Sequence, residues 1–268
     1  MWTTVALAVS LLGAADEAPP LKISHARFTY GPFGMARTDK KFIPGDWAFL
    51  SYDIENLRMD RKTSKVVYGL KLRMTNSKGE LVFEENKNSN VEVFNALFST
   101  AQPAIGFVEI GADQPAGTYT LTLTVTDRLT KKKAEYNTKF QVLKKTFGFV
   151  KIQAPVLNMV GPDFNFKFGV TGFKRDAKKL PKIKVKLVIR DENDKPTLLR
   201  AVTMRIPGDA NIDPEDIRDE LDFPVSFPLS RSGKFTIKLE AEDLIAEKTI
   251  KFDYSIVVLD PRKFESGK

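Results

Sequence analysis

The chain of 268 residues contains no cysteine and a single histidine, His25. Without cysteine it can form neither a disulfide nor a thiolate metal site, and one imidazole is too few for the usual zinc sites. Catalysis by a serine or cysteine nucleophile needs a base beside the nucleophile, and no Gly-x-Ser-x-Gly elbow is present. No glycine-rich phosphate loop or dinucleotide fingerprint is present either. Composition leaves open only a converging pair of carboxylates. We therefore expect a protein that is not an enzyme, with no cofactor and no metal site.

The best candidate for a calcium site is the segment 209–213, in which oxygen ligands alternate as at the start of an EF-hand loop. The sixth position is Pro214, where such a loop needs glycine for its sharp turn. Asp213 is better suited to cap a short helix, with Pro214 at the first helical position and acidic residues in the first turn. We therefore expect a helix that runs from this cap to Leu221, in a loop that crosses between two sheets.

Long apolar runs are also missing. The apolar run from Val5 to Leu12 is too short to cross a bilayer as a helix, and no later segment is long enough. Small residues follow at Gly13-Ala14-Ala15, as at a signal-peptide cleavage site. The sequence therefore predicts an export signal over 1–15 and a linker over 16–20. The mature protein is expected to be secreted or periplasmic, without a transmembrane segment.

What the sequence does contain is apolar residues at every second position. In the segment 119–125, tyrosine, leucine and valine alternate with threonine, and the segment 235–241 follows the same pattern. Turn signals such as Pro44-Gly45-Asp46 and Pro115-Ala116-Gly117 separate these runs. The pattern predicts an all-β protein built as a β-sandwich. A second helical excursion is expected around Val91 to Leu97.

The alternating pattern occurs twice. The segment from Trp47 to Phe49 matches that from Phe164 to Phe166, 117 positions later, and Gly117–Leu121 matches Gly233–Ile237 at an offset of 116. A constant offset indicates two copies of one domain. We expect the copies over 21–143 and 144–260, followed by a polar tail over 261–268.

The motifs of the two copies resemble those of bacterial immunoglobulin-like or fibronectin-III-like modules. The first copy has Pro44-Gly45-Asp46-Trp47 before an early strand and Pro115–Leu121 leading to Asp127; the second has Pro162-Asp163-Phe164 and Ser232–Phe235 leading to Asp243. The resemblance implies two tandem antiparallel immunoglobulin-like sandwiches. Such modules in exported proteins act as spacers, adhesion units or binding accessories.

A basic face is the first candidate binding surface in a chain of net charge +8. Lys182, Lys184 and Lys186 alternate with apolar residues and project from one side of one strand, and Lys234 and Lys238 extend the patch if the strands are neighbours. Repeated like charge on a sheet is unfavourable unless an anion neutralises it. The face is therefore either a docking surface for an acidic polysaccharide or another polyanion, or a solvated face that prevents aggregation. Nucleic acid is not expected as a partner, because no aromatic residues for base stacking lie between the lysines.

An aromatic surface in the first copy is the second candidate. If Trp47 and Phe49 face the core, the opposite side of their strand is too apolar for open solvent, which marks an interaction site. We expect a surface for a partner protein or a glycan made by Tyr30, Phe33, Trp47 and Tyr52. Two alternatives remain: the extra segment 30–43 folds over this side, or the strand register is shifted by one residue.

The function expected from the sequence is that of a non-catalytic interaction or spacer protein of the cell envelope. Its partner would be another envelope protein or an acidic polysaccharide. The alternative is a dedicated binder of acidic glycans or other polyanions through the lysine face of the second copy.

Overall fold

The computed structural model describes residues 19–207 and 218–265, apart from the side chains of 86–89, 264 and 265. The described chain is built almost entirely of β-strands, with one short helix, α1 (Arg262–Glu265), near its end. The predicted all-β class is confirmed. The proposed export signal, most of the linker and the segment 209–213 lie outside the described residues.

Strands β1 to β9 form two sheets that enclose one hydrophobic core, and we call this part the N-terminal half. The smaller sheet has the order β1-β3-β7 and the larger has the order β2-β9-β8-β5-β4, with β6 also paired to β5. The strands are β1 (Lys22–Thr29), β2 (Lys41–Phe42), β3 (Trp47–Glu55), β4 (Met59–Asp60), β5 (Lys65–Thr75), β6 (Leu81–Phe94), β7 (Ala101–Glu109), β8 (Gly117–Asp127) and β9 (Lys133–Val142). Leu50, Leu72 and Leu123 meet between the sheets, because alternate residues of each strand face inward.

Strands β10 to β17, with α1, form the C-terminal half around a second core. Its sheets have the orders β10-β12-β15 and β11-β17-β16-β13-β14. The strands are β10 (Gly148–Gln153), β11 (Leu157–Met159), β12 (Asp163–Thr171), β13 (Ile183–Asp191), β14 (Val202–Ile206), β15 (Glu220–Pro228), β16 (Gly233–Asp243) and β17 (Lys248–Leu259). The predicted boundary at residue 143 falls between β9 and β10, and the division into two domains stays a prediction.

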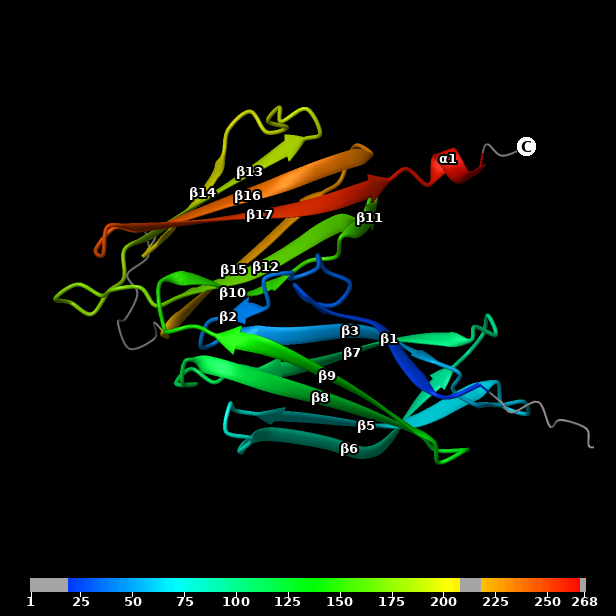
Figure 1. Cartoon of the computed structure of the whole chain (residues 1–268). Helices are drawn as coiled ribbons and strands as arrows, with labels where there is room; N and C mark the ends of the chain where they lie inside the picture. The colour runs from blue at the N-terminus through cyan, green and yellow to red at the C-terminus, as the bar shows by residue number, and fades with distance from the viewer. Residues whose placement is uncertain (1–18, 208–217, 266–268) are drawn as a thin grey trace, which may run out of the picture.

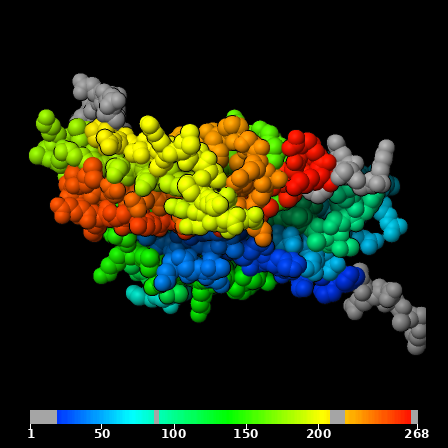
Figure 2. Space-filling model, turned by 90° about the horizontal axis from the view of Figure 1, so that it is seen from above, coloured from blue at the N-terminus to red at the C-terminus, as the bar shows by residue number. Residues whose placement is uncertain are grey.

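The four sheets are stacked in layers, with β1-β3-β7 and β10-β12-β15 in the middle (Figure 1). Seen from above, the C-terminal half covers much of the N-terminal half, and teal and cyan segments of the N-terminal half are visible at one end (Figure 2). Tyr30 and Met35 of the N-terminal half pack against the core of the C-terminal half. The Met35 amide also donates a hydrogen bond to the Tyr254 hydroxyl, at 2.9 Å. The two halves therefore share an interface.

The structure decides between the alternatives left open for the strand that contains Trp47. In β3 the residues that face the core are Ala48, Leu50, Tyr52 and Ile54, whereas Trp47 and Phe49 lie on the opposite side against Phe107. The register is therefore shifted by one residue relative to the interpretation that placed Trp47 and Phe49 in the core. The cause is that Trp47 and Phe49, at the start of β3, are apolar although they face away from the core, whereas the residues that continue this side are polar: Ser51, Asp53 and Glu55.

The helical excursion expected around Val91 to Leu97 is wrong. Val91 and Val93 belong to β6 and pair with Tyr68 and Val66 of β5. Of the helix expected between Asp213 and Leu221, the described part contradicts the end, because Leu221 lies in β15. No helix in the described ranges has the length and apolar character needed to cross a membrane.

Candidate functional site

The lysine face is in large part neutralised by the protein itself. Lys184 forms an ion pair with Glu242 at 3.2 Å, Lys182 with Asp176 at 3.6 Å, and Lys238 with Asp194 at 3.2 Å. Lys186 lies opposite Glu240 in the register of β13 and β16, and neither Lys186 nor Lys234 has an ion-pair partner among the described residues. Carboxylates of β16 and of the loops on either side of β13 thus supply much of the counter-charge that an external anion was expected to supply.

The four aromatic residues of the second predicted surface are not brought together. Tyr52 is buried in the N-terminal core, where burial raises the pKa of its hydroxyl. Tyr30 packs edge-to-face on Phe252 of the C-terminal half, with ring centroids 5.0 Å apart. Only Phe33 of the set is largely exposed, at 72%. The expectation of one aromatic surface is therefore corrected. Tyr30 is covered by the C-terminal half, and Tyr52 belongs to the core of the N-terminal half.

Asp46 is the polar centre of the interface between the halves. Its side chain is almost fully buried and accepts an ion-pair hydrogen bond from Arg37 at 2.6 Å. Its other oxygen accepts hydrogen bonds from the backbone amides of Trp47, at 2.8 Å, and Lys151 of β10, at 2.7 Å. A buried carboxylate is stable only with such partners, so Asp46 ties β10 to the start of β3.

Trp47 lines a cavity of about 400 Å³ at this interface. Its other walls come from β10, β12 and β15 and include Lys151, Lys167 and Asp222. The Lys151 ammonium lies 5.2 Å from the centre of the Trp47 ring and 2.7 Å from Glu220. Burial raises the pKa of Glu220 against the opposing effect of Lys151. Trp47 therefore contacts Lys151 and Phe107 within the chain and also borders this cavity.

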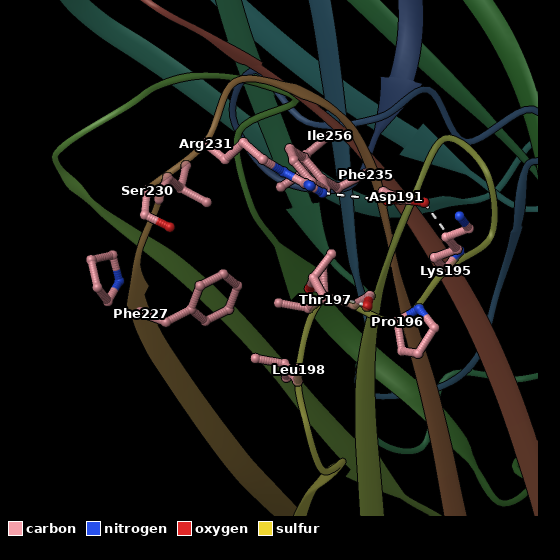
Figure 3. A pocket seen from close by; sticks show the side chains of 13 residues that line it. Asp191, Lys195, Pro196, Thr197, Leu198, Phe227, Ser230, Arg231, Phe235 and Ile256 are labelled. Atoms are coloured by element: carbon pink, nitrogen blue, oxygen red, sulfur yellow. Dashed lines mark hydrogen bonds and ion pairs between the residues drawn. The ribbon is translucent and has the colours of Figure 1, made fainter.

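A second cavity, of about 500 Å³, lies at one end of the C-terminal half between its two sheets (Figure 3). Its walls come from β13, β15, β16, β17 and the two loops that follow β13 and β15. The apolar lining residues are Ile189, Leu198, Phe227, Leu229, Phe235 and Ile256. These side chains line the gap between the sheets, so the inner surface of the cavity is largely apolar. We call it the end pocket.

The rim of the end pocket is charged. Arg231 crosses the face of Phe235, with its guanidinium 5.3 Å from the ring centre, and reaches Asp191 at 3.5 Å (Figure 3). Asp191 also accepts hydrogen bonds from the backbone amides of Asn193 and Lys195, at 3.0 and 3.1 Å. Those hydrogen bonds, with Arg231, lower the pKa of the Asp191 carboxyl. The turn after β13 is thus fixed, and it holds one carboxylate and one guanidinium at the entrance.

The end pocket opens beside the start of β14, which is an edge strand. Thr197 lines the pocket and donates its backbone amide to Ile189 of β13 at 2.9 Å, and Val202 begins β14 five residues later. Within the described ranges β14 pairs with β13 alone, so its outer backbone groups have no strand partner there. An edge strand of this kind can accept a further strand. The sequence offered no signal for this arrangement, because residues from four strands form it.

His25 lies on the surface, where its side chain is 71% exposed and its Nδ1 is 3.0 Å from an Asp53 carboxylate oxygen. It sits at a bulge in the pairing of β1 with β3. Among the described residues no group of three or more histidine, cysteine, aspartate or glutamate side chains is arranged to hold a metal ion.

Comparison with known proteins adds little. No protein-family model matches the chain, and no curated protein matches it. Among solved structures, that of red sea bream transglutaminase is similar with a TM-score of 0.28 and 11% sequence identity. The match covers 90% of this chain but 31% of that one, so the chain spans under a third of its length.

The expectation that the chain is not an enzyme is withdrawn, since the similar solved structure belongs to an enzyme. A likeness this weak assigns no activity to the chain.

Proposed function

We propose that this chain is an exported interaction protein of the cell envelope, built of two tandem immunoglobulin-like copies. In this proposal its C-terminal half binds an extended segment of a partner protein. The segment adds to the edge strand β14 and places one apolar side chain in the end pocket.

The observation that carries the proposal is the position of the end pocket beside the start of an edge strand. Strand addition gives affinity through main-chain hydrogen bonds, whereas a neighbouring pocket gives specificity through one side chain. Burying one leucine- or phenylalanine-sized side chain contributes about 1.5 to 3 kcal/mol, and the walls of Leu198 and Phe227 supply the apolar contact. Arg231 and Asp191 at the rim select for polar or charged groups that flank that side chain.

A selection from a displayed library of extended peptides tests the proposal. The full chain is the target, and a variant with Thr197→Arg, which places a bulky cation in the pocket wall, is the counter-target. The control is Thr249→Arg, an exposed position in β17 with the same change in charge. We expect peptides that bind the unchanged chain and the Thr249→Arg control but not the Thr197→Arg variant. Enrichment of peptides that bind all three chains equally would contradict the proposal.

A further inference from the structure

Three chain reversals of the N-terminal half meet at one end of the larger sheet. They are the turn between β4 and β5 (61–64), the loop between β6 and β7 (95–100) and the turn between β8 and β9 (128–132). The Asn95 amide donates a hydrogen bond to the Ser64 carbonyl at 2.9 Å, and the Arg128 amide donates to Val67 at 3.0 Å. These contacts place all three reversals side by side, and we call this end of the sheet the tip. In Figure 1 the tip lies on the right of the N-terminal half, where the green turn joins β8 to β9.

The tip is strongly cationic. Its exposed basic residues are Arg58, Arg61, Lys62, Lys65, Lys131, Lys132 and Lys133. The exposed acidic residues beside them are Asp60 and Glu92, and Glu92 forms an ion pair with Lys65. Asp127 is buried and its carboxylate accepts backbone hydrogen bonds, so its position is fixed within the fold. Seven basic residues thus stand beside two exposed carboxylates at the tip, which gives this end of the sheet an excess of positive charge.

Apolar side chains project from the same tip. Phe94, Leu97 and Phe98 are 63%, 90% and 68% exposed, and Leu129 in the neighbouring turn is 58% exposed. A cluster of exposed, large apolar residues ringed by polar ones marks an interaction site.

The loop that carries Leu97 and Phe98 is held in shape by its own hydrogen bonds. The Asn95 side chain donates to the Ser99 carbonyl at 2.8 Å and accepts from the Ser99 amide at 3.0 Å. Phe98 has a φ of 51°, which is unusual for a bulky residue. Such strain persists where surrounding contacts impose it and is common at binding sites. The loop thus presents two large apolar side chains outward at a cost in backbone energy.

The C-terminal half shows that a hairpin of this kind does not need a cationic turn. Its hairpin between β16 and β17 has the same construction, with Asp243 in the place of Asp127. The five residues after Asp243 read Leu-Ile-Ala-Glu-Lys, whereas the five after Asp127 read Arg-Leu-Thr-Lys-Lys. Two hairpins of one geometry therefore differ in the charge of their turns, although the counterparts of Arg58 and Lys62, Lys174 and Lys178, are also basic.

We infer that the tip docks on the surface of an anionic phospholipid bilayer. Basic side chains are attracted to anionic headgroups, while apolar side chains enter the boundary between headgroups and acyl chains. An acidic glycan would account for the cations but would leave Leu97 and Phe98 in water. The bilayer accounts for both sets of side chains, since it presents negative charge above an apolar layer.

Sedimentation of the full chain with vesicles tests the inference. We expect the chain to sediment with vesicles of phosphatidylcholine and phosphatidylglycerol, and much less with phosphatidylcholine alone. A variant with Arg61→Glu, Lys62→Glu and Lys131→Glu is expected to bind the anionic vesicles about a hundredfold more weakly. A variant with Leu97→Ser and Phe98→Ser is expected to lose about tenfold. All five substituted positions are exposed, and thermal unfolding of each variant verifies that it is folded.

The matched control for charge is Lys178→Glu, Lys186→Glu and Lys234→Glu, which changes three exposed lysines of the C-terminal half by the same amount. The matched apolar control is Leu157→Ser with Leu244→Ser, two exposed leucines of that half. Both controls are expected to bind like the unchanged chain.

Equal loss in the charge control would overturn the inference in favour of a general effect of net charge. Binding that survives both tip variants would place the contact elsewhere in the chain. Loss only in the charge variant of the tip, with equal competition by a soluble polyanion, would assign the tip to a glycan and overturn the bilayer.

Discussion

Asp127 and Asp243 lie 116 positions apart and make the same set of hydrogen bonds. Asp127 accepts from the backbone amides of Arg58, Leu129 and Thr130. Asp243 accepts from those of Lys174, Ile245 and Ala246, each 116 positions further on. Both carboxylates are buried. The match supports the proposal that the halves are two copies, since each aspartate closes a hairpin and ties it to a preceding strand connection.

Replacing either aspartate by alanine is expected to destabilise the chain to a similar degree. Asp127→Ala and Asp243→Ala each remove the acceptor of three backbone amides, and a buried donor left without a partner costs about 1 to 3 kcal/mol. We expect each variant to lose about 3 kcal/mol in a urea denaturation experiment. Asp113→Ala, at an exposed position, is the control and should change stability by less than about 0.5 kcal/mol. A large effect at one aspartate and none at the other would contradict the equivalence.

Asp46 is expected to be more important for stability than Asp163, its counterpart 117 positions later. Asp46→Ala leaves the buried Arg37 guanidinium without its partner and removes the acceptor of the Lys151 amide. Breaking a buried pair in this way costs about 3 to 5 kcal/mol. Asp163 is exposed at the start of β12, so Asp163→Ala should change the free energy of unfolding by less than about 0.5 kcal/mol. Equal effects would show that the interface does not depend on Asp46.

Glu220 is expected to make stability depend on pH. Burial raises its pKa above the ordinary value of 4.5, so the folded chain binds this proton more tightly than the unfolded chain does. The stability that the protonated Glu220 carboxyl contributes is therefore fully present below pH 4.5. It is lost as the pH rises through the pKa of Glu220 in the folded chain. Glu220→Gln cannot ionise, and unfolding measured from acid to neutral pH should show the variant gaining stability relative to the unchanged chain. A difference in the free energy of unfolding that stays constant with pH, or that changes in the opposite direction, would contradict this prediction.

The lysine face is expected to contribute less to polyanion binding than the tip. Lys182→Glu, Lys184→Glu and Lys186→Glu together place acidic groups beside Glu240 and Glu242, which should cost about 1 kcal/mol of stability. The tip variant with Arg61→Glu, Lys62→Glu and Lys131→Glu has the same net charge as this lysine-face variant. On an anionic-polysaccharide column the tip variant should elute at lower salt, because fewer carboxylates lie beside the basic residues that it removes. The reverse order of elution would assign the polyanion contact to the lysine face.

Alternation and turn chemistry were sufficient to predict the all-β class. Tyr119, Leu121 and Leu123 alternate with threonines and are buried as expected. Alternation was ambiguous at the start of β3, where Trp47 and Phe49 are apolar on the side that faces away from the core and pack against Phe107. The alternation of Val91 and Val93 with polar residues in β6 was also overlooked.

The candidate sites were harder to predict because they depend on neighbours far apart in the sequence. Lys184 meets Glu242 across 58 positions, so its compensation is invisible without the strand order. The end pocket and the tip each combine several loops. In the tip, the run of basic residues from Lys131 to Lys133 was visible in the sequence, but its proximity to Leu97 and Phe98 was not.

Hydrogen exchange of β14 is the most direct test of the proposed function. The full chain is measured with and without a peptide obtained from the selection against the end pocket. If the peptide adds as a strand, amides of Val202–Ile206 should exchange more slowly in its presence, and the Thr197→Arg variant should show no such protection. Unchanged exchange in β14 with a bound peptide, or equal protection in the Thr197→Arg variant, would contradict binding at this edge.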